Sequence, residues 1–402
     1  MNERRYDIDW LRIVAILAVF LFHCARFFGG GDWHLVNDSQ SLLATIFIGL
    51  LDLWIMPLFM LLSGAGTWYS LRSRTGGQYL LERVKRILVH LYGIGTFVLL
   101  APQAYFEYFT HTEGATITFW QYYPRYVVGI FSRVNFGSPF FFNIMYGHLW
   151  FLQYLFLISL ILLPLLLFLK SEGGQRFIAK LAGWCSHRGG IFLLLVPLVV
   201  VRIAFVHLFD GEHTWADMLA FAVFFLIGYI MVADQRFTES IKKHGWICLA
   251  LGILGFGGEG YFILGLRYNY AELYHPGGEP FSLMYVLFWI VMGVARFSWV
   301  FFMLSIGAKY LSFRGRVLAY GSEAQLPFYI FHQTIILCVG WFVIPLSIGM
   351  LPKYIIIVVI SFVLIMGLYE LLARRFNVMR FLFGMRPKLG MRPKKLPDRE
   401  LS

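Results

Sequence analysis

The chain has 402 residues, of which 59% are hydrophobic and only 14% charged, and its mean hydropathy is +0.69. A water-soluble domain of this length could not bury so much apolar surface, so a soluble globular enzyme is excluded and a lipid bilayer is the expected solvent. Cationic loops and anionic lipid headgroups account for the net charge of +12, and we therefore expect membrane lipids and not nucleic acid as partners.

Ten stretches are apolar and long enough to cross a bilayer, which takes about 20 residues of helix. They predict an all-α polytopic membrane protein with about ten transmembrane helices. The first carries Asp9 and Arg12 and no clear small-residue cleavage site follows it, so we expect a retained helix and not a cleaved signal peptide. In chain order the predicted spans are Ile8–Phe28, Leu42–Leu62 (extending as far as Tyr69), Ile87–Tyr105, His148–Leu169, Ile191–Leu208, Trp215–Val232, Trp246–Leu264, Phe281–Ile306, Leu326–Leu346 and Tyr354–Ala373.

The cations alternate with this pattern of spans. If the N-terminus is cytoplasmic, 26 of the 34 Lys and Arg residues fall in cytoplasmic segments and 4 fall in the opposite loops. Cytoplasmic loops carry an excess of Lys and Arg, so both termini are predicted to be cytoplasmic. We divide the chain into a ten-helix membrane domain, residues 1–374, and a basic flexible tail, residues 375–402, in which GMRPK occurs twice.

The predicted outer loop Phe106–Gly147 contains many aromatic residues, and one more directly precedes it. An aromatic belt at the membrane–water interface is the favoured explanation, and stacking on sugar rings is the alternative. The four cysteines are scattered without a C-x-x-C pair, so we expect neither a disulfide framework nor a metal site. The aromatic residues of the outer loop Phe106–Gly147, with the one that precedes it, are Tyr105, Phe106, Tyr108, Phe109, Trp120, Tyr122, Tyr123 and Tyr126.

Arg12 and His23 lie on the first predicted span. Eleven residues of helix rise about 16 Å and make about three turns, so the two side chains share a face at different depths. Ionisable groups inside a bilayer usually face a polar cavity or a partner. The pair suits a long cytosolic donor with anionic phosphates and a reactive end. Snorkelling of Arg12 beside Asp9 and a structural role for His23 remain the alternatives.

Five segments together resemble the acyltransferase-3 superfamily of integral-membrane acyltransferases. In the first segment the family's mark is an Arg, ten residues and a His, which Arg12 and His23 match. The resemblance covers Arg5–Arg374, and we expect a membrane module without the soluble esterase-like domain that some members carry. The segments are RRYDIDWLRIVAILAVFLFH, MPLFMLLSGAGTWYSL, ERVKRILVH with its R-x-x-R, GHLWFLQYLF and GSEAQLPFYIFHQTII.

The resemblance implies acyl-CoA as donor and a hydroxyl, usually on a sugar, as acceptor. We predict His23 as the general base, because a histidine can take up the hydroxyl proton near neutral pH. A covalent acyl-histidine is the less favoured alternative. Arg12, Arg83 and Arg86 are predicted to bind the CoA phosphates, since arginine forms bidentate charge-assisted bonds to phosphate. Topology signalling alone is the alternative for these cations.

Three further residues complete the predicted site. Glu323 is the acidic catalytic candidate, because relatives carry a functional acid in that region; an acid stabilised at a helix N-terminus is the alternative. His332 is predicted to contact substrate or to join a polar network. His148 is predicted to line the acceptor entrance, or to be an interfacial histidine.

The sequence therefore predicts a membrane O-acyltransferase of the bacterial inner membrane. It would move an acyl group, most often acetyl, from cytosolic acyl-CoA to a glycan or lipid-linked glycan. A multispan transporter or flippase without acyl-transfer chemistry is the alternative, since buried ionisable groups suit that class too.

Overall fold

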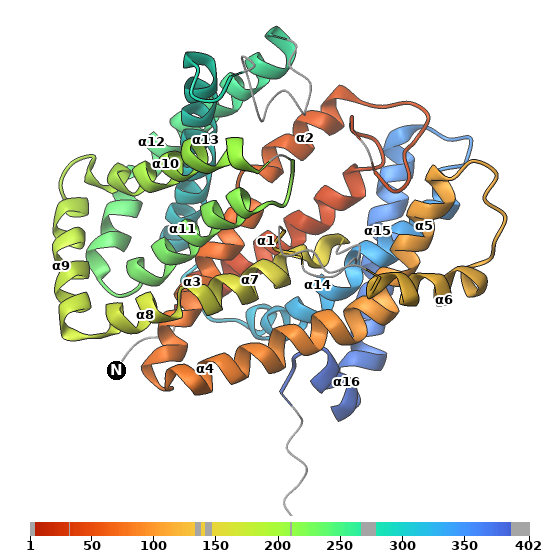
Figure 1. The fold of residues 1–402 in the computed structure, drawn as a ribbon, viewed down its shortest axis with the longest axis horizontal. Helices are drawn as coiled ribbons and strands as arrows, with labels where there is room; N and C mark the ends of the chain where they lie inside the picture. The colour runs from red at the N-terminus through yellow and green to blue at the C-terminus, as the bar shows by residue number, and fades with distance from the viewer. Residues whose placement is uncertain are drawn as a thin grey trace, which may run out of the picture.

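The computed structural model describes residues 5–31, 33–132, 138–140, 147–209, 211–266 and 279–386, and every regular element within them is a helix (Figure 1). The α-helices are α1 (Tyr6–Ala25), α2 (Leu42–Asp52), α3 (Ile55–Arg72), α4 (Gly76–Arg83), α5 (Ala101–His111), α6 (Phe119–Ile130), α7 (Trp150–Ile161), α8 (Leu163–Lys170), α9 (Glu172–Ser186), α10 (Val196–Phe205), α11 (Trp215–Met231), α12 (Gln235–Gly260), α13 (Leu283–Tyr310), α14 (Arg316–Val343), α15 (Met350–Leu368) and α16 (Asn377–Leu382). The π-helical stretches are η1 (Val84–Leu88), η2 (His90–Leu100), η6 (Tyr261–Gly265) and η7 (Tyr369–Ala373), and the 3-10 turns are η3 (Gly147–Leu149), η4 (Gly190–Leu195) and η5 (Val206–Leu208).

The described helices match the ten predicted spans in order. Eight are long and apolar enough to cross a membrane, and the pair α7–α8, bent by 55°, makes a ninth. The remaining predicted span, Trp215–Val232, corresponds to α11, a shorter apolar helix of 17 residues. The prediction of an all-α polytopic membrane protein is confirmed. The cytoplasmic location of both termini stays a prediction.

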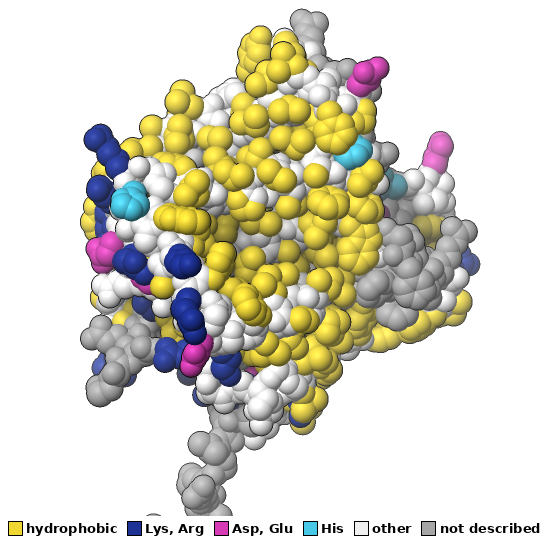
Figure 2. Space-filling model, turned by 60° about the vertical axis from the view of Figure 1, so that its left-hand side comes forward, with side chains coloured by type: hydrophobic (Ala, Val, Ile, Leu, Met, Phe, Trp, Pro, Cys, Tyr) yellow, Lys and Arg dark blue, Asp and Glu magenta, His cyan; other side chains and the backbone are white. Residues whose placement is uncertain are grey.

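The surface agrees with this assignment. Figure 2 shows one face on which hydrophobic side chains form a broad continuous area, while Lys and Arg gather along one side. Many large apolar side chains of the spans are exposed, among them Leu254 on α12 and Val363 on α15. Exposed apolar side chains at this density are expected where lipid and not water surrounds the helices.

Several helices are longer than their apolar windows. The predicted span Leu42–Leu62, with its extension as far as Tyr69, lies within a 31-residue stretch, Leu42–Arg72, that has a short break between α2 and α3. Helix α14 begins at Arg316, ten residues before the predicted span. Hydropathy detects only the apolar part of a helix, so it does not predict the polar turns at the helix ends.

The third span is distorted along much of its length. A single 36-residue stretch, Gly76–His111, contains both η1 and η2, and its backbone leaves helical geometry at Gly93. The hydroxyl of Thr96 donates to the carbonyl of Leu91, five residues back, at 2.7 Å. Side-chain insertion into the helical ladder and π-turns both bend helices, and π-turns are frequent at functional sites.

Helix α1 lies in the middle of the bundle, where it contacts α2, α3, α13, α14 and α15 (Figure 1). Helices α3 and α11 approach each other unusually closely. A Cβ built on Gly64 would overlap the carbonyl of Phe225, and a Cβ built on Gly228 would overlap the carbonyl of Leu61. Small residues let helix backbones touch in membranes, where packing, not hydrophobic burial, drives association.

Replacing Gly64 by alanine is expected to destabilise the folded protein by about 1–3 kcal/mol, because the new methyl group meets backbone that cannot turn away. Thermal unfolding of the purified protein in detergent measures the loss. Gly77→Ala is the matched control, since nothing lies within 4 Å of a Cβ at that position. A Gly64→Ala protein as stable as the control would show that this contact is not constrained.

The described chain continues into the predicted tail. Helix α16 falls within it, and both Arg380 and Phe383 are buried. Nε2 of His90, in the distorted third span, lies 3.1 Å from the carbonyl of Phe381. Residues 387–402, the rest of the predicted tail, lie outside the described residues.

Candidate functional site

Three of the predicted site residues, His23, His148 and His332, meet inside the bundle. His23 lies in the last turn of α1, His148 in the turn η3 before α7, and His332 near the middle of α14. Nε2 of His332 is 3.3 Å from Nδ1 of His23. The rings of His148 and His332 are 4.7 Å apart between centroids. His148 and His332 are buried, whereas His23 is only partly so.

Backbone carbonyls determine which ring nitrogens carry hydrogen, because a carbonyl oxygen can only accept. Nδ1 of His23 lies 2.8 Å from the carbonyl of Val19, and Nδ1 of His332 lies 2.6 Å from that of Tyr329. Both Nδ1 atoms therefore donate when the rings are neutral. Nε2 of His23 then carries a lone pair and makes no hydrogen bond with any described residue. Nε2 is therefore the ring nitrogen of His23 that could accept a proton.

His148 is fixed from three sides. Its Nε2 donates to the carbonyl of Ile330 at 3.1 Å, and the side-chain amide of Gln103 donates to its Nδ1 at 3.3 Å. The Tyr329 hydroxyl donates to the backbone carbonyl of His148. With both ring nitrogens engaged, His148 has less freedom than His23 to exchange a proton.

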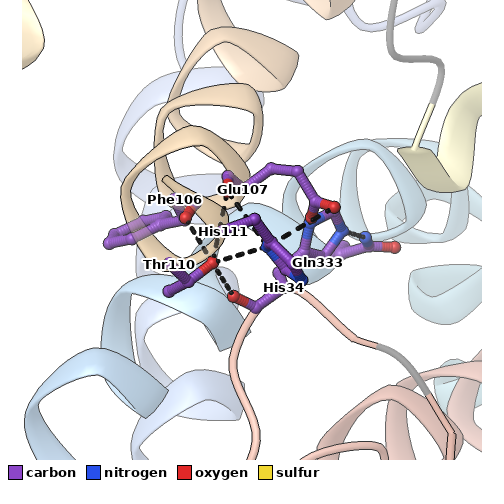
Figure 3. A network of polar contacts seen from close by, with 6 residues as sticks. All are labelled: His34, Phe106, Glu107, Thr110, His111 and Gln333. Carbon is purple, nitrogen blue, oxygen red and sulfur yellow. Dashed lines mark hydrogen bonds and ion pairs between the residues drawn. The ribbon is translucent and has the colours of Figure 1, made fainter. Parts of the chain in front are cut away.

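A second polar group adjoins the three histidines, and the sequence did not single it out (Figure 3). Nδ1 of His34 is 2.5 Å from Oε2 of Glu107 on α5, and its Nε2 is 3.1 Å from the amide of Gln333, the neighbour of His332. The ring of Trp33 contacts both groups, with centroids 5.6 Å from His23 and 4.7 Å from His34.

Trp33 also carries a buried Nε1–H that has no acceptor among the described residues. A buried donor next to a base is available to a bound oxygen atom. His34 and Glu107 were missed because they lie 73 positions apart, in two different predicted loops. A polar residue beside an apolar segment is a weak signal unless its partner is known.

Two predicted phosphate ligands, Arg12 and Arg83, contact the same stretch of α3. Nη2 of Arg12 donates to the carbonyl of Leu62 at 2.8 Å, and Nη2 of Arg83 donates to the hydroxyl of Thr67 at 2.7 Å. Gly66 leaves room for this approach, since a Cβ there would lie 2.9 Å from Nη2 of Arg12. Arg12 also pairs with Asp9 at 3.2 Å, the contact that the snorkelling alternative proposed.

Arg86, the third predicted phosphate ligand, lies more outward. Its Nε pairs with Glu82 at 3.2 Å, and the same carboxylate pairs with Arg74 at 3.0 Å. The Arg86 side chain is 49% exposed. Ion pairs at this exposure are weak and exchange readily, so Arg86 can turn to a stronger anion. Arg12, Arg83 and Arg86 are thus the residues that could hold a phosphorylated donor.

Glu323 lies apart from the histidines. Its carboxylate accepts from Nη2 of Arg380 on α16 at 2.8 Å and lies 3.8 Å from Nε of Arg374. Nine residues of α14 separate it from His332, a rise of about 13 Å. The structure therefore brings Glu323 to the C-terminal segment and not to His23.

Two cations inside the spans had no predicted role. Arg202 forms an ion pair with Asp217 and lies 4.2 Å above the ring of Trp289. Arg296 lies 3.8 Å from Asp52. Pairing is the usual way to hold a charge within a bilayer. No group of three or more His, Cys, Asp or Glu suited to a metal ion occurs in the part of the chain that the structure describes.

The arrangement joins an anion-binding end to a proton-accepting end. On α1, Arg12 and His23 are about 16 Å apart along the helix axis. A donor held by phosphates at one end could present an acyl carbon near the other. The histidine and Glu107 cluster offers proton acceptance and hydrogen bonds to hydroxyl groups.

Comparison with known proteins gives a match to the family model described as "Acyltransferase domain", Acyl_transf_3, over residues 5–370. Similar curated proteins include "Glucans biosynthesis protein C" of Escherichia coli O6:K15:H31, 22% identical over 420 residues, and the protein of the same name from Shigella dysenteriae, 22% identical over 423 residues. The Escherichia coli K12 protein of that name is 21% identical over 422 residues. Each alignment covers 99% of this chain and 98% of the relative. No solved structure matches.

Proposed function

This chain belongs to the acyltransferase-3 family of membrane acyltransferases, and from that premise we propose that it is an acyl-CoA-dependent O-acyltransferase acting on a glycan or lipid-linked glycan. The relatives' name, which refers to glucans, supports a glucan acceptor, and their bacterial origin supports the inner membrane. Acetyl is the acyl group to test first. Family membership does not favour the transporter or flippase alternative.

The observation that carries the proposal is the 2.8 Å contact between Nδ1 of His23 and the carbonyl of Val19, which leaves Nε2 of this partly buried residue as the nitrogen that can accept a proton. Val19 orients the ring through Nδ1, and the lone pair of His332 lies 3.3 Å from the same nitrogen. When Nε2 takes up a proton, the ring becomes cationic and its Nδ1–H becomes a stronger donor to both acceptors. His23 is therefore the general base, and His332 and Val19 hold its ring in place.

The reaction then proceeds in two proton-linked steps. His23 removes the acceptor hydroxyl proton as the oxygen forms a bond to the thioester carbon, which gives a tetrahedral oxyanion. Collapse of that intermediate breaks the carbon–sulfur bond. The CoA thiolate leaves with the proton from His23, and the products are the O-acyl ester and CoA.

The donor end is assigned to Arg12, Arg83 and Arg86. Arg12 and Arg83 converge on the Ser-Gly segment of α3, and Arg86 lies one turn further along the third span. Arginine has five N–H donors, so Arg83 can keep its bond to Thr67 and still bind an anion. We leave Glu323 out of the proton transfer because Arg380 engages it elsewhere.

Purified protein in detergent or lipid nanodiscs tests the proposal directly. With acetyl-CoA and a soluble glucan, we expect CoA release that depends on the glucan, together with an ester detected on the glucan by mass spectrometry. Succinyl-CoA serves as the second donor. Folded protein that binds and consumes neither acyl-CoA would contradict the proposal and favour transport.

A further inference from the structure

An open cleft of about 440 Å³ lies between α5 and α6, beyond the site described above. Its wall contains three tyrosines, and its polar groups come from Glu107, His111 and Arg125. The tyrosine rings form a row, with Tyr108 and Tyr122 stacked at 5.1 Å and Tyr122 and Tyr126 stacked at 6.3 Å. The cleft-lining side chains used here are Glu107, Tyr108, His111, Tyr122, Arg125 and Tyr126.

Helix α6 divides the aromatic residues of this loop into two sets. Trp120, Val128 and Phe131 are 79%, 74% and 61% exposed and recur at helical spacing along one face. That face suits the membrane–water interface, as the belt interpretation requires. Tyr122 and Tyr126 point away from it and line the cleft. An aromatic belt at the membrane–water interface therefore accounts for the exposed face of α6 but not for the tyrosines that line the cleft.

The cleft tyrosines differ in what their hydroxyls do. Tyr126 donates to the carbonyl of Thr96 at 2.9 Å, which anchors α6 on the third span. The hydroxyls of Tyr108 and Tyr122 make no hydrogen bond to any described residue. Burial raises the pKa of Tyr122, and Tyr108 and Glu107 nearby raise it further, so this phenol stays protonated at physiological pH.

We propose that this cleft is a subsite for one sugar residue of the acceptor glycan, an inference that rests on the proposed function. A sugar ring presents an apolar C–H face, which packs on aromatic rings, and a rim of hydroxyls. Carboxylate, imidazole and guanidinium groups supply acceptors and donors for that rim. Glu107 and Arg125 carry opposite charges, so the site suits a neutral polar ligand better than an anionic one.

The cleft is joined to the histidines through Glu107. This residue lines the cleft, and its Oε2 is 2.5 Å from His34. His34 in turn contacts Gln333 (Figure 3), which directly follows His332 in the chain, and the ring of Trp33, which also contacts that of His23. In this proposal one unit of the glycan occupies the cleft, and the contacts from Glu107 through His34 and Trp33 give the direction in which the adjoining unit would reach His23.

Binding of soluble glucose oligosaccharides of defined linkage, measured without acyl-CoA on the full-length protein, tests the subsite. We expect Tyr122→Ala and Tyr108→Ala each to weaken binding about tenfold, since loss of a stacked ring removes about 1.4 kcal/mol. Tyr122→Phe keeps the ring and should retain most of the affinity. Trp120→Ala, on the exposed face of α6, is the matched control and should bind normally.

The transfer reaction gives a second readout. Tyr122→Ala should raise the KM for the oligosaccharide, whereas Trp120→Ala should leave that KM unchanged. Three results would each overturn the subsite. The first is unaltered oligosaccharide binding in both tyrosine variants, and the second is an equal loss of binding in Trp120→Ala. The third is a wild-type protein that turns over acetyl-CoA but does not bind the oligosaccharide. Oligosaccharide binding that depends on Tyr122, in a protein that never consumes acyl-CoA, would support the subsite and refute the proposed function.

Discussion

Replacing His23 by alanine is expected to lower the turnover of acyl transfer by about a hundred- to ten-thousand-fold, which is the usual contribution of a positioned general base. The loss corresponds to about 3–5 kcal/mol in the activation barrier. Binding of acetyl-CoA should persist, because the proposed phosphate ligands lie at the other end of the site. The measurement is turnover with saturating glucan beside calorimetric titration with acetyl-CoA.

Three controls separate the chemical role of His23 from a structural one. His187→Ala removes an exposed histidine and should behave as wild type. His332→Gln removes the ring whose nitrogen lies 3.3 Å from His23, and a smaller fall in turnover is expected because His332 only orients the base. Intact-mass analysis during turnover should find no acylated protein; a stable acyl-enzyme would favour the covalent alternative. Full activity in His23→Ala would refute the assignment of the base.

The double variant Arg83→Ala, Arg86→Ala is expected to weaken CoA binding by at least about a hundredfold, since each hydrogen bond to a charged group contributes about 1.5–3 kcal/mol. Turnover at saturating donor should change much less than KM for acetyl-CoA. Affinity of the wild-type protein should fall with added salt, because partly exposed charges are screened. The variant should lose most of that salt dependence.

Arg176→Ala is the matched control for the arginine pair. Arg176 is another predicted cytoplasmic cation, its side chain is 77% exposed, and its contact is an ion pair with Glu172 on its own helix. If Arg83 and Arg86 act only as topology signals, both variants will bind CoA equally well. A comparison of CoA with 3′-dephospho-CoA then shows whether the pair recognises that phosphate, since the variant should no longer distinguish the two.

The sequence by itself determined the order and approximate position of the apolar helices. Lipid selects runs of about 20 apolar residues regardless of their partners, so the signal is local. The prediction was less exact at the ends of the helices. Helix α14 begins at Arg316, ten residues before the predicted span, because its first turns are too polar to be marked by hydropathy.

The same locality explains which site residues were predictable. His23 and Arg12 stand out because an ionisable group within an apolar run is costly and therefore rare. The convergence of His23, His148 and His332 was not predictable, since residues 125 and 184 positions apart along the chain meet only through packing of α1, η3 and α14.

Only the tertiary structure decided the partners. It assigned Glu323 to Arg380, placed His34 on Glu107, and separated the lipid-facing side of α6 from the cleft side. These contacts depend on which helix faces meet across the bundle. A side chain's spacing within its own helix fixes its depth and its face but carries no information about the group that will lie opposite.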